Sequence, residues 1–290
     1  MALLRSSLAE KAEAFANSFK IGRTHLQDAV PMTLGQEFSG YAHQVLASTE
    51  RVTAAMDGMY ELPLGGTAVG TGLNAPEGFA GRTISRLAER SQLPFHEARN
   101  HFEAQGAKDA VLFLSGALKS YAVALTKIAN DIRWLGSGAI RELRLKAMQP
   151  GSSIMPGKVN PVIAESVLMV CAQVIGHDAA ITWACAGGNF ELNTMMPVIA
   201  FDLLDSIALL STSSRNLAEL CVRDLVAEPA SAGESGVAMA TLLAPEIGYD
   251  LAAAIAKEAQ ETGRSVREVA LGKSGLSADR LEALLHPSAV

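Results

Sequence analysis

Residues 151–161, GSSIMPGKVNP, combine groups that could bind a small anion. Ser152 and Ser153 supply hydroxyls, Lys158 a cation and Asn160 an amide, among prolines and glycines that interrupt a helix. One point charge beside one directional donor suits a carboxylate. The alternative is a plain connection between helices with a serine cap, which has little use for a lysine and an asparagine around a Met-Pro-Gly turn. We therefore predict a binding loop here.

A second polar segment, KIGRTHLQDAVPMTLGQEF, spans residues 20–38 and places Thr24 and His25 ahead of a long helix. Thr33 with Gln36 three residues later predicts a capping box at the start of that helix. His25 is not needed for capping, and an imidazole titrates in the range that suits proton transfer near neutral pH. On these residues alone a structural and a catalytic role for His25 both stay open.

Two further features have simpler interpretations. His177 and Asp178 interrupt an apolar run, and a hydrogen-bonded core or interface histidine is favoured there over a proton carrier. The glycine-rich stretch ELPLGGTAVGTGLNAPEG at 61–78 lacks the lysine and leading strand of a phosphate-binding loop. We expect a tight connection between helices at 61–78 and leave both features outside the site.

Composition narrows the class of protein. The net charge is −6 without a cluster of Lys or Arg, which argues against a nucleic-acid surface. No stretch of eighteen apolar residues is free of polar interruption, so we expect a cytoplasmic protein without a membrane span. The three cysteines are too few and too scattered for a disulfide framework, and no His/Cys/Asp cluster suggests a metal. No cofactor is expected.

Four segments carry an apolar seam that alternates steps of four and three residues, which is typical of bundle helices. They lie at 34–59, 114–135, 163–181 and 199–220. The sequence LMVCAQVIGHDAAITWACAG is apolar nearly all round, so other chains are expected to cover it. We predict an all-α fold whose long-helix bundle forms a shared oligomeric core at 1–224, followed by a small helical C-terminal domain at 225–290.

GSSIMPGKVNP resembles the signature loop of the fumarase/aspartase superfamily, and GRTHLQDAVPMTLGQEF resembles its second shared region. LGGTAVGTGLN at 64–74, KIANDIRWLGSG at 127–138 and GNFELN at 188–193 are similar to class II fumarase. The histidine in THLQDA favours fumarase over aspartase, where glutamine is usual. The resemblance covers nearly the whole chain and implies reversible hydration of fumarate to L-malate, with aspartate ammonia-lyase as the alternative.

The resemblance also implies roles for individual residues. Ser152, with Ser153 as the second candidate, would remove the proton next to the substrate carboxylate, and Lys158 and Asn160 would hold that carboxylate and stabilise the aci-carboxylate. His25, paired with Glu165, would protonate the leaving hydroxide through a water, and Thr24 would contact substrate. The predicted site therefore consists of seven residues: Thr24, His25, Ser152, Ser153, Lys158, Asn160 and Glu165.

The chain departs from the family pattern at its start. Family members have a long segment before THLQDA, with a substrate loop resembling SSxMNxNE, and this N-terminal third has no counterpart here. A shortened form of the protein, a separate N-terminal chain, and an inactive remnant that only oligomerises all fit this departure. Family sites are shared between subunits of a homotetramer, so we expect a likewise shared site for a small dicarboxylate.

Overall fold

The computed structural model describes residues 1–290 except 150–154, 156–157, 229–236 and 286–290. Helices dominate the described residues, and the strands form only two-stranded pairings. The all-α expectation is confirmed at the level of fold class, because these short pairings connect helices and do not build a layer of their own. The β1–β2 hairpin is the one pairing that bears on the predicted site.

The four predicted seams lie on four long helices. These are α2 (Leu34–Met56), α5 (Asp109–Leu135), α6 (Val162–Cys185) and α7 (Met196–Asn216). Their lengths of 23, 27, 24 and 21 residues agree with the sequence pattern. All seven seam residues of α5 are buried, from Leu114 to Leu135. The seams therefore face the core, as a 3.5-residue repeat requires.

Contacts divide the chain into two units. The bundle unit comprises Met1–Arg5, Ala42–Ile132 and Asn160–Cys221. The hairpin unit comprises Ser6–Tyr41, Arg133–Val159 and Val222–Val290. The domain boundary predicted at residue 224 is a separate matter and stays a prediction.

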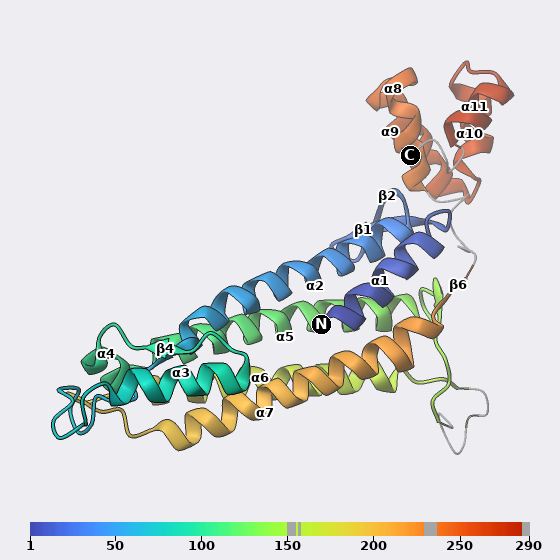
Figure 1. The fold of residues 1–290 in the computed structure, drawn as a ribbon. Helices are drawn as coiled ribbons and strands as arrows, with labels where there is room; N and C mark the ends of the chain where they lie inside the picture. Colours follow the sequence, from blue (N-terminus) through green and yellow to red (C-terminus); the bar gives the residue numbers. More distant parts are fainter. Residues whose placement is uncertain (150–154, 156–157, 229–236, 286–290) are drawn as a thin grey trace. The chain divides into compact units, whose positions relative to one another are not determined.

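In the bundle unit α6 and α7 lie side by side (Figure 1), and hydrogen bonds join α5 to both of them, from Ser115 to Asp178 on α6 and between Tyr121 and α7. Tyr121 on α5 and Ser214 on α7 form a hydrogen bond of 2.6 Å between their buried hydroxyl oxygens. Short elements connect the long helices and complete the unit. They are η1 (Asp57–Tyr60), β3 (Glu61–Leu62), α3 (Phe79–Ser91), β4 (His96–Glu97), α4 (His101–Gly106) and η2 (Leu217–Cys221).

The hairpin unit has its own core. Ile21 on strand β1 packs in one buried cluster with Leu243, Ile255 and Val269 of the C-terminal helices. The helices of this unit are η3 (Val222–Asp224), η4 (Val237–Leu243), α8 (Ala244–Ile247), α9 (Tyr249–Thr262), α10 (Val266–Lys273) and α11 (Ala278–Leu285), with most of α1 (Ala2–Ala14). Its strands are β1 (Phe19–Thr24), β2 (Gln27–Thr33), β5 (Leu143–Arg144) and β6 (Val226–Ala227).

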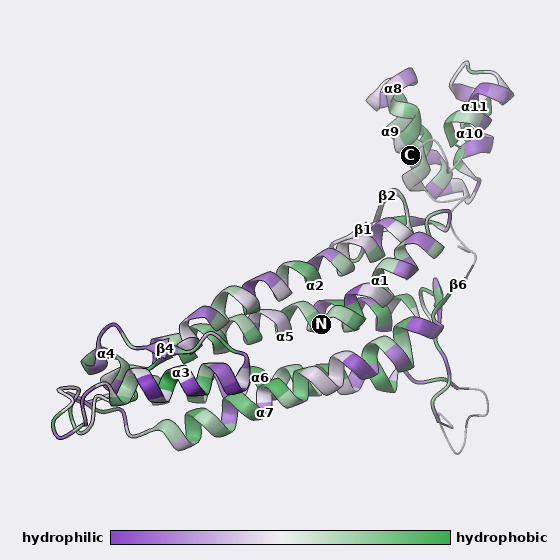
Figure 2. Cartoon of the chain, in the orientation of Figure 1, coloured by the Kyte–Doolittle hydropathy of each residue, from purple (hydrophilic) through white to green (hydrophobic). Residues whose placement is uncertain are grey.

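Several long helices expose apolar side chains. Figure 2 shows hydrophobic residues along much of α6 and α7, whereas α3 is more hydrophilic. Trp183 on α6 is 78% exposed and Phe201 on α7 is 69% exposed. By length and composition alone, α5, α6 and the run Met196–Asp224 could cross a membrane. Such faces need an apolar environment, which another protein chain also supplies.

Candidate active site

Thr24 and His25 lie where strand β1 turns into strand β2. The strands are antiparallel with Thr24 opposite Gln27, so His25 and Leu26 form a two-residue loop. Both have positive φ, 56° and 59°, the signs that a type I′ turn requires. The turn is exposed, and Leu26 is 72% accessible. The hairpin thus presents the imidazole to solvent on a backbone that non-glycine residues rarely adopt.

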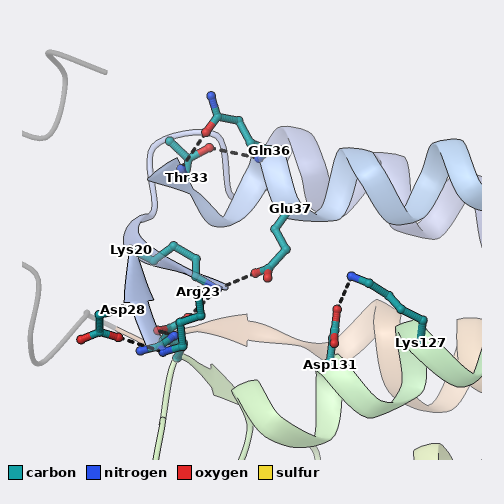
Figure 3. Close-up of polar contacts among 9 residues, drawn as sticks. Lys20, Arg23, Asp28, Thr33, Gln36, Glu37, Lys127 and Asp131 are labelled. Atoms are coloured by element: carbon teal, nitrogen blue, oxygen red, sulfur yellow. Dashed lines mark hydrogen bonds and ion pairs between the residues drawn. The ribbon is translucent and has the colours of Figure 1, made fainter. Parts of the chain in front are cut away.

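A cluster of charges, here called the Glu142 cluster, joins the hairpin to the rest of its unit. It consists of Lys20, Arg23, Asp28, Glu37 and Glu142. Lys20 Nζ lies 2.6 Å from Glu37 Oε2 (Figure 3) and 2.8 Å from Glu142 Oε2. Arg23 donates from Nη1 to Glu142 Oε1 at 2.6 Å, and its Nε lies 3.2 Å from Asp28 Oδ1. Two carboxylates therefore hold Lys20, and Glu142 holds both cations.

The Glu142 cluster lies in the interior at its centre. Lys20 is 4% exposed and Glu142 is 7% exposed, so solvent and salt screen this pair weakly. Burial by itself opposes the charged form of Arg23, but the hydrogen bond and charge of Glu142 outweigh it and raise the pKa of the guanidinium, with Asp28 and Glu37 adding to the rise. Arg23 is consequently a fixed positive charge one residue before Thr24.

The capping box predicted at the start of α2 is confirmed. The Gln36 backbone N–H donates to Thr33 Oγ1 at 3.1 Å, and the Thr33 N–H donates to Gln36 Oε1 at 2.9 Å (Figure 3). The cap fixes where the helix begins, and it therefore fixes Glu37 in the first turn, within reach of Lys20. The helix cap thus helps to position Glu37 in the Glu142 cluster.

The structure describes the predicted loop residues only in part. Ser152 and Ser153 lie outside the described residues, and Lys158 is exposed. Asn160 precedes helix α6, with its carbonyl accepting the Val162 N–H at 2.9 Å, and Glu165 lies in the first helical turn. Asn160 and Glu165 therefore lie at the same helix end, as Thr24 and His25 lie at the same hairpin end.

Thr24 and His25 belong to the hairpin unit, as does Lys158. Asn160 and Glu165 belong to the bundle unit. The roles of all seven residues stay predictions. Among the described residues, no group of three or more His, Cys, Asp or Glu side chains could hold a metal ion.

The predicted GNFELN segment forms a tight turn in the bundle unit. Asn189 and Leu192 form an isolated bridge, and Phe190 at the tip has a φ of 52° and is 95% exposed. The backbones of Gly188 and Gly106 are in close contact, since a Cβ at Gly188 would lie 2.3 Å from the Gly106 carbonyl oxygen. A Cβ at Gly106 would in turn lie 2.7 Å from the Phe190 carbonyl oxygen, so neither position has room for a side chain.

His177 is an interior histidine, as the sequence favoured. Its Nδ1 lies 3.1 Å from Ser206 Oγ on α7, and its Nε2 lies 2.8 Å from Gln173 Nε2. Because the Ser206 hydroxyl donates to the Asp202 carbonyl at 2.7 Å, His177 Nδ1 must carry the proton and donate to Ser206. His177 therefore joins α6 to α7 inside the bundle unit.

Sequence reasoning missed the Glu142 cluster. Arg23 and Glu142 are 119 residues apart, so no local pattern connects them. The one indication in the sequence was the pair of cations Lys20 and Arg23 close to Ile21, an apolar residue that the structure buries. Charged residues are almost never fully buried unless they are paired, so this stretch called for buried acidic partners.

Comparisons with known proteins agree with this architecture. The family described as "Lyase" matches residues 1–176, and the domain described as "Fumarase C C-terminus" matches residues 239–290. The chain is 50% identical over 287 residues to a protein named fumarate hydratase class II from Thermosynechococcus vestitus, covering 96% of this chain and 61% of that protein. The namesake from Mycobacterium tuberculosis is 50% identical over 285 residues, covering 96% and 60%.

Among solved structures, class II fumarase from Schistosoma mansoni superposes with a TM-score of 0.94 at 37% identity, covering 99% of this chain and 64% of that one. The chain thus spans about three fifths of the length of the curated relatives that it matches. The "Lyase" match alone covers more than half of the chain. The chain therefore belongs to this lyase family, and the resemblance to class II fumarase within the fumarase/aspartase superfamily is confirmed.

Proposed function

We propose that the chain acts as a fumarate hydratase, which interconverts fumarate and L-malate by adding or removing water. The observation that carries the proposal is the 50% identity to proteins of that name over 96% of the chain. The names of these relatives do not favour the alternative, aspartate ammonia-lyase. Because the chain spans about three fifths of those relatives, the proposal concerns the activity of the whole protein.

The proposed chemistry assigns the seven predicted residues as follows. In dehydration Ser152 takes the proton from the carbon next to a malate carboxylate, and Ser153 is the second candidate for this base. Lys158 and Asn160 hold that carboxylate while negative charge develops on it, which lowers the barrier. The electron pair left on carbon then forms the double bond as the carbon–oxygen bond breaks.

The leaving hydroxide needs a proton, and we assign the donation of this proton to His25 acting through a water. Glu165 is the proposed partner of the imidazole, and Thr24 is proposed to contact the substrate. His25 is exposed on a turn whose strands are held by the buried Glu142 cluster, which suits a group that must meet substrate at a defined position. Glu165 lies at a helix start, where a carboxylate is favoured.

The proposal includes a homo-oligomer, with a tetramer as the expected state and sites shared between subunits. Its support is the apolar surface of the bundle unit, which includes Met169 at 71%, Trp183 at 78% and Phe201 at 69% exposure. We propose that other copies of the chain, rather than lipid, cover these helices and that the protein is cytoplasmic. Solubility without detergent, with a mass by light scattering above that of one chain, tests this part.

A fumarate-loss assay tests the activity. It follows the ultraviolet absorbance of fumarate with the chain alone, and again with the unmatched part of a relative added as a separate polypeptide, which also tests the proposal of a separate N-terminal chain. We expect loss of fumarate and formation of malate without ammonia. A requirement for ammonia would indicate aspartate ammonia-lyase instead. Oligomers without turnover in either arm, at high protein concentration, would indicate an inactive remnant and refute the proposal.

Substitutions assign the base in the same assay. Ser152→Ala is expected to abolish turnover, whereas Ser153→Ala should retain most of it. Ser39→Ala is the control, because this exposed hydroxyl only donates to the Gln36 carbonyl within helix α2. Loss of activity in Ser153→Ala with retention in Ser152→Ala would reverse the assignment of the two serines.

A further inference from the structure

The turn that carries Thr24 and His25 is not held by its own side chains. Among the described residues, neither side chain has a hydrogen bond or an ion pair, and both are exposed. The direction in which His25 points must therefore come from the strands on either side of the turn and from whatever holds those strands. A catalytic group needs such support, since a displacement of about 1 Å can reduce a rate by orders of magnitude.

The pairing of β1 with β2 is irregular between the two cations of β1. The register shifts between Ile21 and Arg23, where two residues of β2, at positions 29 and 30, lie opposite Gly22 alone, as in a β-bulge on β2. In a regular strand Lys20 and Arg23, three positions apart, would point to opposite faces. Both cations nevertheless reach the same carboxylate, with Lys20 Nζ at Glu142 Oε2 and Arg23 Nη1 at Glu142 Oε1. Gly22 fits the space at the shift, because a Cβ there would lie 2.9 Å from Met32 Sδ.

Glu142 is itself held firmly. Its backbone N–H donates to the Leu135 carbonyl at 2.9 Å, and its carbonyl accepts the Glu228 N–H at 2.9 Å. Its Oε1 accepts a hydrogen bond from Arg23. Its Oε2 has no hydrogen-bond donor among the described residues in a favourable geometry, so the ion pair with Lys20 is what compensates its charge. A buried carboxylate fixed through both its backbone and its side chain can act as an anchor for a strand.

We propose that Glu142 is a positioning residue for the Thr24–His25 turn: by binding Lys20 and Arg23, which flank the register shift between β1 and β2, its buried carboxylate fixes the direction in which the turn presents His25. The inference rests on the proposed function for its catalytic meaning, but its structural part stands on the hairpin unit alone. Among the described residues, the side chain of Glu142 binds Lys20 and Arg23 and forms no hydrogen bond or ion pair with His25, so its effect on the turn is transmitted through strand β1.

The test uses the full chain with three variants. Glu142→Gln removes the charge, Glu142→Asp keeps the charge but shortens its reach, and Glu228→Gln is the matched control. Glu228 lies close by on the chain segment that pairs with Glu142, but its side chain forms an exposed ion pair with Arg144. Amide hydrogen exchange of β1 and β2 is compared with that of α6, and the His25 imidazole signal is followed by NMR after its assignment with His25→Asn.

For Glu142→Gln we expect at least tenfold faster exchange in β1 and β2, unchanged exchange in α6, and a displaced His25 signal. Glu142→Asp should recover most of the protection but keep the displaced signal, because the shorter side chain cannot reach both cations at once. Glu228→Gln should match the wild type in all three measurements. If Glu142→Gln does not fold, Glu142→Asp and Arg23→Lys, which both keep the charges, carry the test.

In the fumarate assay both Glu142 variants should lower kcat at least tenfold while KM changes less than threefold. A His25 signal and a kcat equal to those of Glu228→Gln would overturn the inference, and so would faster exchange spread equally over β1, β2 and α6. Exchange and NMR need no turnover. A wild-type chain that does not hydrate fumarate would therefore refute the proposed function while these two measurements still decide the inference.

Discussion

Two buried carboxylates, Glu142 in the hairpin unit and Asp178 in the bundle unit, are both paired with lysine but in different surroundings. Asp178 accepts the Ser115 hydroxyl at 2.7 Å and pairs with Lys119 at 2.5 Å, and the Lys119 side chain is 45% exposed. The lysine of Glu142 is Lys20, whose side chain is 4% exposed. The two carboxylates are buried to a similar extent, but Lys119 is accessible to water and Lys20 is not.

This difference determines what each ion pair can tolerate. Lys119 lines a cavity of about 640 Å³ together with Arg51 and Phe113, so water can hydrate its ammonium if the carboxylate is lost. Lys20 has no such access, and among the described residues it would keep Glu37 as its one ion-pair partner. An uncompensated buried charge is the main penalty when one member of a buried pair is removed. Loss of the Glu142 charge should therefore destabilise the protein strongly, whereas loss of the Asp178 charge should cost much less stability.

The largest predicted effect is that of Glu142→Gln on stability. We expect the free energy of unfolding of the hairpin unit to fall by about 3 to 5 kcal/mol, the range typical of a broken buried ion pair. Urea denaturation followed by hydrogen exchange in β1 measures it. A loss no larger than that of Asp178→Asn would remove the contrast between the two carboxylates.

A neutral polar pair in the bundle unit sharpens the comparison. Burial raises the pKa of Tyr121 to about 12, against which its hydrogen bond with Ser214 acts only in part. Because the folded state binds this proton more tightly, the stabilisation is complete below about pH 10 and is lost between pH 10 and 12, by about 2 kcal/mol at pH 12.

Unfolding measured from pH 9 to 12 should show this loss in the wild type and a smaller one in Tyr121→Phe. Tyr249→Phe is the matched control, since Tyr249 is 78% exposed and its variant should follow the wild type. Equal pH dependence in all three proteins would contradict the expectation. Cys221, whose pKa is raised to about 12 by burial, contributes alike to all of them.

Asp178→Asn should have a smaller effect, about 1 kcal/mol, because Asn keeps an oxygen for the Ser115 hydroxyl and Lys119 can turn to water. Thermal unfolding of this variant beside Ser115→Ala measures it. Filling the cavity should enlarge the effect, so Gly116→Leu, which adds a side chain at the cavity wall, is expected to make Asp178→Asn more destabilising. A loss as large as that of Glu142→Gln would contradict the role given to water.

The smallest effect is predicted for Glu228→Gln. Its ion pair with Arg144 spans 3.1 Å between side chains that are 37% and 67% exposed, so the expected change is less than about 0.5 kcal/mol. Raising the salt concentration should abolish even this difference, while the penalty of Glu142→Gln should persist, because buried pairs are poorly screened. Urea denaturation in low and high salt distinguishes the two.

Local and periodic features of the fold could be predicted from the sequence. The seam from Leu114 to Leu135 is buried because a 3.5-residue apolar repeat has only one stripe to bury. The capping box at Thr33 follows from two residue types three positions apart. The His177 interior position follows from its place on a seam. Each of these depends on residues that are near one another in the chain.

The hairpin turn and the Glu142 cluster could not be predicted in the same way. Two-residue hairpin loops are recognised by Asn, Asp or Gly, and His25 with Leu26 gives no such signal. The partners of Lys20 and Arg23 come from distant parts of the sequence, so only the folded chain brings them together. Ser152 and Ser153 lie outside the described residues, and their roles stay predictions.

The contact between Gly106 and Gly188 has a consequence for how the GNFELN segment can vary among related sequences. A single methyl group at Gly188 would meet the Gly106 carbonyl oxygen, and one at Gly106 would meet the Phe190 carbonyl oxygen, so substitution at both positions is restricted to glycine. The Phe190 side chain at the tip meets no such steric limit, because it is almost fully exposed, although the positive φ of 52° at this position still favours residues that tolerate it. Related proteins should therefore keep the two glycines, while the side chain at the tip of the segment can be exchanged.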